Sequence, residues 1–462
     1  MDVGPGYVRI LLEFERTNDK SDALPEAATR LLTRRNPADV LGQLAEDLNR
    51  AGFLLDRRFG AIPIAGGTRA TSVAPEDFDP YQSKLFILRG YVKADPGDIP
   101  PEIAGGFVHS DPVVSSYSTC ATSAAVGDTE SVQAKLDTAT LHRNELDGTG
   151  VAIAIVDTGI FLPHIEKRLG SAVNFDSNNS WEPPIVTPSG KHRLGHGTMC
   201  AYDALIAAPK ATLLDMAALL NRPYSDHSAQ SEVGAVMRAY APLVHHWVVE
   251  PAIKKQPPPY AALVVNNSWG VLHPSLDLPS GDPARFIDNP NHAFRMQIRA
   301  LANAGVDIVF AASNCGPECP TAVCLGRKCR MIMGANAYDE VLTLGGCDVQ
   351  DQRVGYSSKG PSIRNMPPEK PDLTAYTHFL GSQVVRDFVP DSGTSAASAV
   401  AAGCIAALRT RISQQTTSPG ALFQALKDTA LKVAGPRWDP GYGYGIIRPV
   451  AAARQLNPNL IQ

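Results

Sequence analysis

The sequence predicts an α/β protein, in which a doubly wound parallel sheet follows a small α+β domain. Three continuous apolar runs predict the sheet, since such runs are typical of central parallel strands covered on both faces. They are "VAIAIV" at 151–156, "AALVV" at 261–265 and "DIVFAA" at 307–312. Helical patterns lie between them, such as "HAFRMQIRALANAG" before the third run. This alternation is typical of doubly wound folds, and we expect the domain to span residues 132–462.

Residues 1–120 predict a separate small domain. "YVRILLEFE" alternates apolar and polar side chains, as a strand with one buried face requires. The helix that follows has a capping residue, Asn36, and a proline at its first position, Pro37. The remaining elements are strands at 54–64 and 84–94, a short helix beginning near residue 99, and a last strand at 113–117. The order β, α, β, β, α, β predicts a ferredoxin-like sandwich.

Charge and hydrophobicity narrow the partners that we expect. The chain of 462 residues has a formal net charge of -4, so neither nucleic acid nor an anionic membrane surface is an expected partner. We find no apolar run of ~18 residues, the length that a transmembrane helix needs. The first residues, "MDVGPGYVRILLEFERTNDK", lack a basic segment followed by a long apolar one. We therefore predict a cytoplasmic protein.

Polar residues follow the predicted strands at positions where they can do chemistry. The reactive site of an open α/β sheet lies beyond the carboxyl ends of its strands. The first apolar run is followed by Asp157, the second by residues 266–270, and the third by Ser313 and Asn314. Two further motifs begin helices, "GHGT" with His196 and "GTS" with Ser395. An acid, a histidine and a serine in this order form one of the known arrangements of the serine-hydrolase triad.

These motifs resemble those of the subtilisin family of serine peptidases, the subtilases. The matching stretches cover roughly residues 150–453 and occur in the family's order: "VAIAIVDTGI", "GHGTMCA", "VVNNSWG", "VFAASNCG", "SGTSAASAVAAG" and "GYGYGIIRPVAAA". The resemblance implies a subtilisin-like fold and a serine endopeptidase that acts on peptide or protein substrates. It requires no cofactor, although subtilases often bind calcium in surface loops, and we name no calcium ligands here.

The resemblance also implies roles for individual residues. Ser395 would be the nucleophile, His196 the base that takes its proton, and Asp157 the group that orients the histidine. Asn314 would donate its side-chain amide to the oxyanion, together with the backbone N–H of Ser395. A further set would pair with the substrate backbone as an edge strand: Ser268, Trp269 and Gly270.

Other interpretations of the same residues are open. Taken singly, Asp157, His196 and Ser395 suit a turn, a structural histidine and a helix cap. The two triplets that begin at Asp157 and Asp391 also match the signature of aspartic peptidases, whose paired carboxylates share a proton. An acyl-enzyme that is captured by an amine would make the protein a peptide ligase or macrocyclase. From a different class, the chain could be a catalytically silent binding module with a blocked cleft.

Four cysteines follow Asn314 at C-x3-C-x4-C-x4-C spacing: Cys315, Cys319, Cys324 and Cys329. Four thiolates could bind zinc, but the tight C-x2-C pairs of structural zinc sites are absent. At least one disulfide is the second alternative, which a reducing cytosol disfavours. Free thiols in a loop at the rim of the site are the third.

The resemblance implies that residues 1–120 are a propeptide, which assists folding and then inhibits the enzyme within the same chain. Residues 121–131 are small and polar, as in a linker, and we expect self-cleavage between Tyr117 and Val126. Such a chain would be a self-inhibited zymogen. The alternative is a permanent accessory domain that is never removed.

Overall fold

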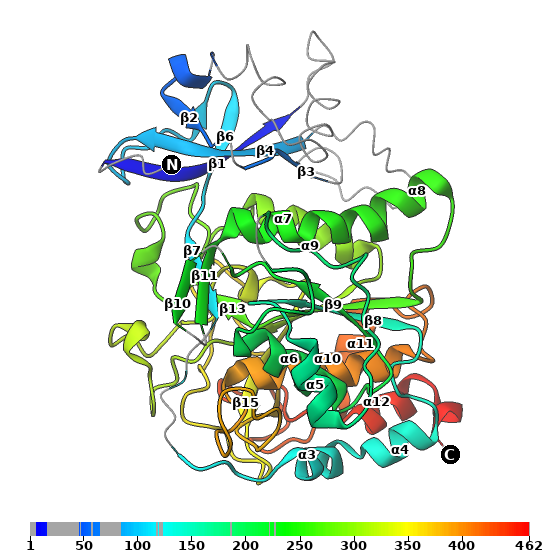
Figure 1. Ribbon diagram of the computed structural model, residues 1–462. Coiled ribbons are helices and arrows are strands. Elements are labelled where there is room, and N and C mark those ends of the chain that lie inside the picture. Colours follow the sequence, from blue (N-terminus) through cyan, green and yellow to red (C-terminus); the bar gives the residue numbers. More distant parts are fainter. Residues whose placement is uncertain are drawn as a thin grey trace. The chain divides into compact units, whose positions relative to one another are not determined.

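The described part of the chain forms two compact units (Figure 1). The computed structural model describes residues 6–15, 46, 48–56, 59–64, 85–116, 119, 123–184, 187–220, 222–225 and 228–461. The first unit comprises Met1–Val113, Glu232–Pro258 and Pro274–Ala304, and the second comprises Val114–Ser231, Pro259–His273 and Gly305–Gln462. Residues 232–258 and 274–304 belong to the range that we predicted as one domain, 132–462, and the structure groups them with the N-terminal residues.

A parallel sheet of six strands forms the centre of the second unit, in the order β16-β15-β14-β12-β8-β9. The three apolar runs are β8, β12 and β14, and every one of their residues is buried. This confirms the predicted α/β fold with a parallel sheet. The chain passes from β8 to β9 at one edge of the sheet, and the next strand, β12, lies on the other side of β8. The strand order therefore reverses at β8, which is a topological switch point. The strands span Val151–Val156 (β8), Thr212–Met216 (β9), Ala262–Asn267 (β12), Asp307–Ala311 (β14), Leu342–Cys347 (β15) and Leu373–Tyr376 (β16).

The helix that begins with the "GTS" motif, α10 (Gly393–Arg409), is buried along its whole length. Its small side chains allow it to pack closely against α6 (Gly195–Leu205) and against β12, β14 and β15. The other helices of this unit are α3 (Thr129–Leu136), α4 (Thr138–Arg143), α5 (Leu162–Leu169), α11 (Pro419–Thr429) and α12 (Pro449–Leu456), with single 3-10 turns at Ala322–Cys324, Gly334–Ala337 and Pro458–Leu460. Within the described residues, none of the chain's helices has the length and hydrophobicity needed to cross a membrane.

A second sheet has the strand order β10-β11-β7-β13. Its strands are β7 (Val113–Ser116), β10 (Arg222–Ser225), β11 (Ser228–Glu232) and β13 (Trp269–Gly270). β7 is antiparallel to β13, with Ser116 opposite Trp269 and Ser115 opposite Gly270. The last strand predicted for the small domain therefore exists but does not join the sheet of that domain. The prediction was wrong on this point because β11 and β13, both far away in the sequence, are the neighbours of β7 in the sheet.

The sheet of the first unit has the order β2-β4-β1-β6-β5, and β3 also pairs with β4. The predicted strand at 54–64 is divided into β2 and β3. The predicted helix near residue 99 is wrong, because β5 and β6 form a hairpin there. Ala104 and Gly105 have φ of +50° and +79°, as the favoured two-residue hairpin turn requires. The strands span Tyr7–Glu15 (β1), Phe53–Leu55 (β2), Ile62–Ile64 (β3), Leu85–Lys93 (β4), Glu102–Ile103 (β5) and Gly106–Ser110 (β6).

Helices α7 (Val233–Val244), α8 (Glu250–Lys254) and α9 (Ala293–Asn303) also belong to the first unit, with a π turn at His245–Val249 and a 3-10 turn at Pro274–Leu276. The predicted caps Asn36 and Pro37 lie outside the described residues. The described end of that predicted helix, residue 46 and residues 48–50, is helical.

Candidate active site

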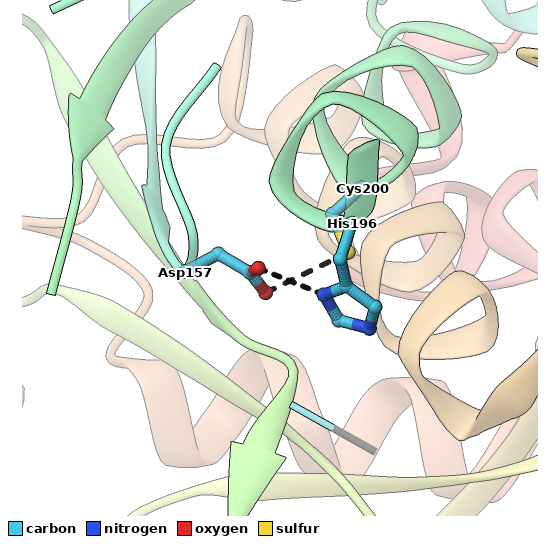
Figure 2. Close-up of side chains that lie close together, drawn as sticks. All are labelled: Asp157, His196 and Cys200. Atoms are coloured by element: carbon cyan, nitrogen blue, oxygen red, sulfur yellow. Dashed lines mark hydrogen bonds and ion pairs between the residues drawn. The ribbon is translucent and has the colours of Figure 1, made fainter. Parts of the chain in front are cut away.

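Asp157 and His196 meet at the carboxyl end of β8 (Figure 2). Nδ1 of His196 lies 2.7 Å from Oδ1 of Asp157. The Asp157 carboxylate is fully buried, and the same oxygen accepts the backbone N–H of Thr158 at 2.7 Å. A carboxylate at Nδ1 favours the tautomer that has its proton on Nδ1. Nε2 of His196 is then an acceptor that can take a proton.

Local hydrogen bonds join the loop after β8 to the first turn of α6. The backbone N–H of Gly197 donates to the hydroxyl of Thr158 at 2.9 Å, and the N–H of Phe161 donates to the hydroxyl of Thr198 at 2.9 Å. The "GHGT" motif thus supplies a donor to Thr158 of the "DTG" motif, and the loop after "DTG" supplies a donor to Thr198 of "GHGT". These bonds explain why the "DTG" and "GHGT" motifs occur together, and they position Asp157 against His196.

A second buried pair supports the same loop, and the sequence-based prediction missed it. Nδ1 of His192 lies 2.9 Å from Oδ2 of Asp215, and this oxygen also accepts the N–H groups of Ile160 and Gly190 at 3.1 and 2.8 Å. Asp215 lies within β9. A single aspartate inside an apolar strand belongs to no recognisable sequence motif. Only its hydrogen-bond partners in the structure show that Asp215 supports the loop after β8.

Ser395 is the third residue of α10. Its Oγ is buried and, like Nε2 of His196, has no hydrogen-bond partner among the described residues. Neither atom is therefore engaged elsewhere, as expected of a nucleophile and its base before substrate binds. The hydroxyl of Ser268 donates to the carbonyl oxygen of Ser395 at 3.3 Å and lies 3.0 Å from Oγ of Ser398. This places Ser268 directly against the first turn of α10.

The side chain of Asn314 lies beside the start of α10. Its Oδ1 accepts the backbone N–H of Thr394 at 2.9 Å and the Thr394 hydroxyl at 3.1 Å. Its Nδ2 lies next to Gly393, where an added Cβ would be only 2.7 Å away. The amide nitrogen is therefore held near a helix N-terminus, where negative charge is stabilised. The predicted oxyanion residue and the predicted nucleophile are brought to the same turn.

The predicted substrate-pairing residues follow β12. Trp269 and Gly270 form β13, which pairs with β7 of the same chain. Nε1 of Trp269 donates to the side-chain oxygen of Asn267 at 3.1 Å, and the amide of Asn336 donates to the Trp269 carbonyl at 2.9 Å. Asn336 is a support that no sequence motif indicated. These bonds hold β13 in place so that its backbone can pair with an added strand.

The Asp391 triplet has different partners from the Asp157 triplet. Both carboxylate oxygens of Asp391 accept from Ser382, one from its backbone N–H and one from its hydroxyl. Burial, followed by the nearby charge of Asp391, raises the pKa of Asp203 well above its usual range. Asp391 thus interacts with Asp203, while Asp157 binds His196. The two triplets do not supply a shared proton, so the aspartic-peptidase alternative gains no support.

Two groups of side chains among the described residues could hold a metal ion: Asp157, His196 and Cys200, and His245, His246 and Glu250. Calcium prefers six to eight oxygen ligands, and each of these groups offers a single carboxylate with nitrogen or sulfur, so neither suits calcium. In the first group, Sγ of Cys200 lies 3.9 Å from Oδ2 of Asp157. Burial and the Asp157 charge raise the pKa of this thiol well above its usual range, so the thiol is neutral.

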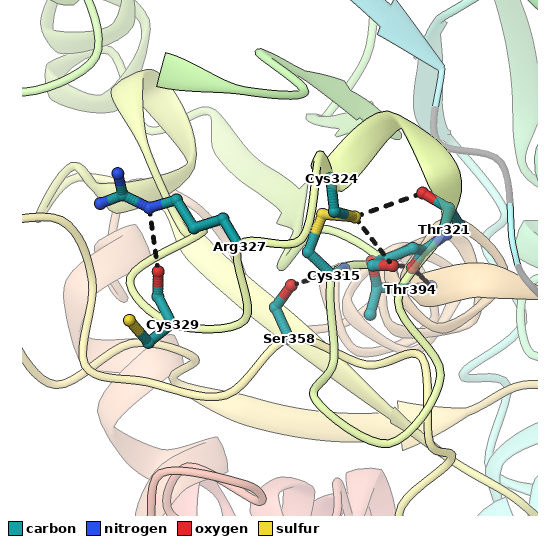
Figure 3. Close-up of a disulfide and its surroundings, with 8 residues drawn as sticks. Cys315, Thr321, Cys324, Arg327, Cys329, Ser358 and Thr394 are labelled. Atoms are coloured by element: carbon teal, nitrogen blue, oxygen red, sulfur yellow. Dashed lines mark hydrogen bonds between the residues drawn. A yellow bond between two sulfur atoms is a disulfide. The ribbon is translucent and has the colours of Figure 1, made fainter. Parts of the chain in front are cut away.

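The cysteine segment contains a disulfide between Cys315 and Cys324 (Figure 3). Cys319 is also disulfide-bonded, whereas Cys329 is a free, exposed thiol. The zinc alternative needs four thiolates, and three of these sulfurs are engaged in disulfides. The structure therefore matches the disulfide alternative.

Comparison with known proteins identifies the family of the chain. The model of the subtilase family matches residues 148–445. The serine protease AprX of Bacillus subtilis is 28% identical over 356 residues, covering 68% of this chain and 71% of AprX. A thermostable alkaline protease of Halalkalibacterium halodurans is 24% identical over 319 residues, covering 68% of this chain and 70% of the protease. A crystal structure of MycP1 without its N-terminal propeptide is 21% identical, covers 70% of this chain and 96% of MycP1, and has a TM-score of 0.44. The chain belongs to the subtilase family.

Proposed function

We propose that the chain is a serine endopeptidase that cleaves peptide bonds through an acyl-enzyme on Ser395. The main support is the 2.7 Å hydrogen bond between His196 and Asp157, because it leaves Nε2 of the histidine as the only ring atom able to accept a proton. Oγ of Ser395 is buried on the neighbouring helix and has no partner among the described residues. Family membership supports the same reaction.

The proposed reaction has two steps. Oγ of Ser395 attacks the peptide carbonyl while its proton passes to Nε2 of His196, and Asp157 stabilises the imidazolium. The amide of Asn314 and the N–H of Ser395 stabilise the oxyanion. His196 then protonates the leaving amine, which breaks the C–N bond and leaves an ester on Ser395. Water, deprotonated by His196, attacks this ester. The ester C–O bond then breaks, His196 returns the proton to Oγ of Ser395, and the carboxylic acid is released.

The N-terminal part of the chain would act as an inhibitor of this site. Ser115 and Ser116 pair with β13 as an added strand, which is the place predicted for substrate. The hydroxyl of Thr119 lies 3.4 Å from Oγ of Ser392, three residues before the nucleophile. These contacts favour cleavage near the start of the predicted window from Tyr117 to Val126. Residues 117, 118 and 120–122 of this window lie outside the described residues.

Intact mass spectrometry of the wild type and of Ser395→Ala, incubated in parallel, tests both proposals. We expect the wild type to lose its residues up to the 117–126 window and the variant to stay whole. If both lose these residues, the cleavage is not made by Ser395. If both stay whole and the wild type hydrolyses no peptide, the chain is the silent module with a blocked cleft, an alternative that the β7 pairing also favours.

Product analysis separates hydrolysis from ligation, because both pass through the same acyl-enzyme. A fluorogenic peptide is incubated with the wild type, with and without an excess of a free peptide amine. We expect a free carboxylate in both reactions. A new amide as the main product would identify a ligase instead.

The predicted cytoplasmic location and the disulfide at Cys315–Cys324 disagree. Disulfides persist mainly in oxidising compartments, and this bridge lies next to the proposed oxyanion group. Cell fractionation with thiol labelling of the native protein decides between a reducing cytoplasm and an oxidising compartment. Recovery from a reducing compartment with Cys315 labelled would support the cytoplasm.

A further inference from the structure

The disulfide at Cys315–Cys324 begins at the residue directly after Asn314 (Figure 3). Both of its cysteines are buried. Sγ of Cys324 lies 3.8 Å from the backbone oxygen of Asn314, and the hydroxyl of Thr321 donates to the same sulfur at 3.2 Å. The bridge therefore contacts the backbone of Asn314 from two directions, through the peptide bond to Cys315 and through Cys324.

The backbone before Asn314 is strained. Ser313 has a φ of +79°, in the left-handed region that residues other than glycine rarely adopt. Such residues persist only where their surroundings hold them, and they cluster at active sites. Released from those surroundings, the backbone at Ser313 would relax and turn the Asn314 side chain away from its position.

Hydrogen bonds hold the residues on both sides of Asn314 to one segment. The N–H of Cys315 donates to the hydroxyl of Ser358 at 3.0 Å, and the N–H of Ser358 donates to the carbonyl oxygen of Ser313 at 3.0 Å. The N–H of Gly316 donates to the carbonyl oxygen of Tyr356 at 2.8 Å. These bonds hold the backbone around Asn314 to residues 356–358, and the disulfide ties the same backbone to Cys324.

The bridged loop is also packed against the strands that form the site. Val323, inside the loop, packs against Leu272 and Ala311. Leu272 lies two residues after β13, and Ala311 is the last residue of β14. The loop is thus seated between the strand expected to bind substrate and the strand that leads to Asn314.

We propose that the Cys315–Cys324 disulfide is a positioning element for the proposed oxyanion group. It holds the strained backbone so that the Asn314 amide, bonded to Thr394 at its oxygen, presents its nitrogen to the transition state. The disulfide touches no reacting atom and acts through Asn314 alone. This proposal rests on the proposed peptidase function.

A double-mutant cycle tests this inference. The variants are C315A/C324A, N314A and the triple variant, with C329A as the control, because Cys329 is an exposed free thiol in the same segment. Steady-state kcat and KM are measured on a fluorogenic peptide, normalised by titration with a serine-reactive phosphonate so that only folded sites are counted. We expect C315A/C324A to lower kcat roughly 10-fold with KM nearly unchanged. In the N314A background, the same change should cost nothing further.

Three results would overturn the inference. An equal loss in both backgrounds would mean that the bridge stabilises the domain without acting through Asn314. An unchanged kcat in C315A/C324A would mean that the bridge is dispensable for positioning. An unchanged kcat in N314A, with an active wild type, would remove the oxyanion role itself, and this outcome is separate from a wild type that cleaves no peptide.

Discussion

At the scale of single residues, replacement of Asn314 should give a large loss of kcat with little change in KM. Its amide would bind the oxyanion, which exists only after the attack on the carbonyl, so its loss should slow turnover without weakening substrate binding. We expect Asn314→Ala to lower kcat roughly 10²–10³-fold, as for the oxyanion asparagine of subtilisin. Steady-state kinetics with the exposed Asn459→Ala as control measure this. A raised KM with unchanged kcat would instead make Asn314 a binding residue.

The buried carboxyl of Asp203 predicts a pH dependence of stability. Burial, followed by the charge of Asp391, raises its pKa well above the usual range. A group with a raised pKa in the folded state contributes stability below its unfolded pKa, about 3.9 for aspartate, and loses that contribution as the pH rises through the folded value. Asparagine cannot ionise, so Asp203→Asn should unfold at a higher temperature than its parent at pH 8.

Thermal unfolding in the Ser395→Ala background, which prevents autolysis, measures this difference between pH 4 and pH 8. The gain should shrink as the pH falls toward the unfolded pKa of the carboxyl. A constant difference across this range would show that Asp203 is not the titrating group. Asp428→Asn, on the exposed part of α11, is the matched control.

At the scale of elements, a buried ion pair joins the strand and the helix that lead to the site. Arg409, at the end of α10, makes two bonds to Asp307, at the start of β14, at 2.6 and 2.7 Å, and both side chains are fully buried. Removing one partner leaves an unpaired buried charge. We expect Arg409→Met to lower the free energy of unfolding by about 3–5 kcal/mol.

Denaturant unfolding in the Ser395→Ala background measures the effect of Arg409→Met. The double variant Asp307→Leu with Arg409→Met should recover most of the loss, because replacing both charges by apolar groups is often neutral. A double variant no more stable than the single one would show that packing, rather than the unpaired charge, causes the loss. α10 carries Ser395 at its other end, so the ion pair also holds the helix that presents the proposed nucleophile.

At the scale of the whole molecule, the first unit contains residues from both sides of the proposed cleavage window. Within this unit, Arg9 binds Glu232 at 2.9 Å, and the backbone N–H of Gly234 donates to Asp111 at 2.6 Å. Arg89 lies 3.5 Å from Glu232. Cleavage between Tyr117 and Val126 leaves all these contacts intact. We therefore expect the N-terminal fragment to co-elute with the rest of the cleaved protein in size-exclusion chromatography.

The double variant Arg9→Gln with Arg89→Gln should release this fragment. It removes the ion pairs that Arg9 and Arg89 make with Glu232 and Asp111 in a buried setting, and the loss of such pairs typically costs about 2–5 kcal/mol of association. Lys93→Gln, at an exposed position of β4, should leave co-elution unchanged. Release of the fragment from the cleaved wild type would mean that the contacts of the first unit do not survive cleavage.

Local sequence determined the central strands and the helices that begin at Gly195 and Gly393, and the resemblance to subtilases supplied the expected roles of the candidate site residues. Continuous apolar runs of five or six residues that contain several β-branched side chains are typical of buried strands, and a polar residue that follows such a strand lies at the carboxyl edge of the sheet. Asp157 and Asn314 were predictable for this reason. The pairing of Asp157 with His196 was implied by the resemblance to subtilases, and in the structure hydrogen bonds between the two motif segments hold the pair together.

Only the tertiary structure decided which distant segments become partners. The hairpin at 102–110, the pairing of β7 with β13 and the grouping of α7 and α9 with the N-terminal sheet all depend on contacts between segments that lie far apart in the chain. The same holds for the buried carboxylates Asp203, Asp215 and Asp307. The physical reason is that periodicity and capping signals report the local backbone, whereas a strand edge or a buried charge is satisfied by whichever partner the completed fold brings to it.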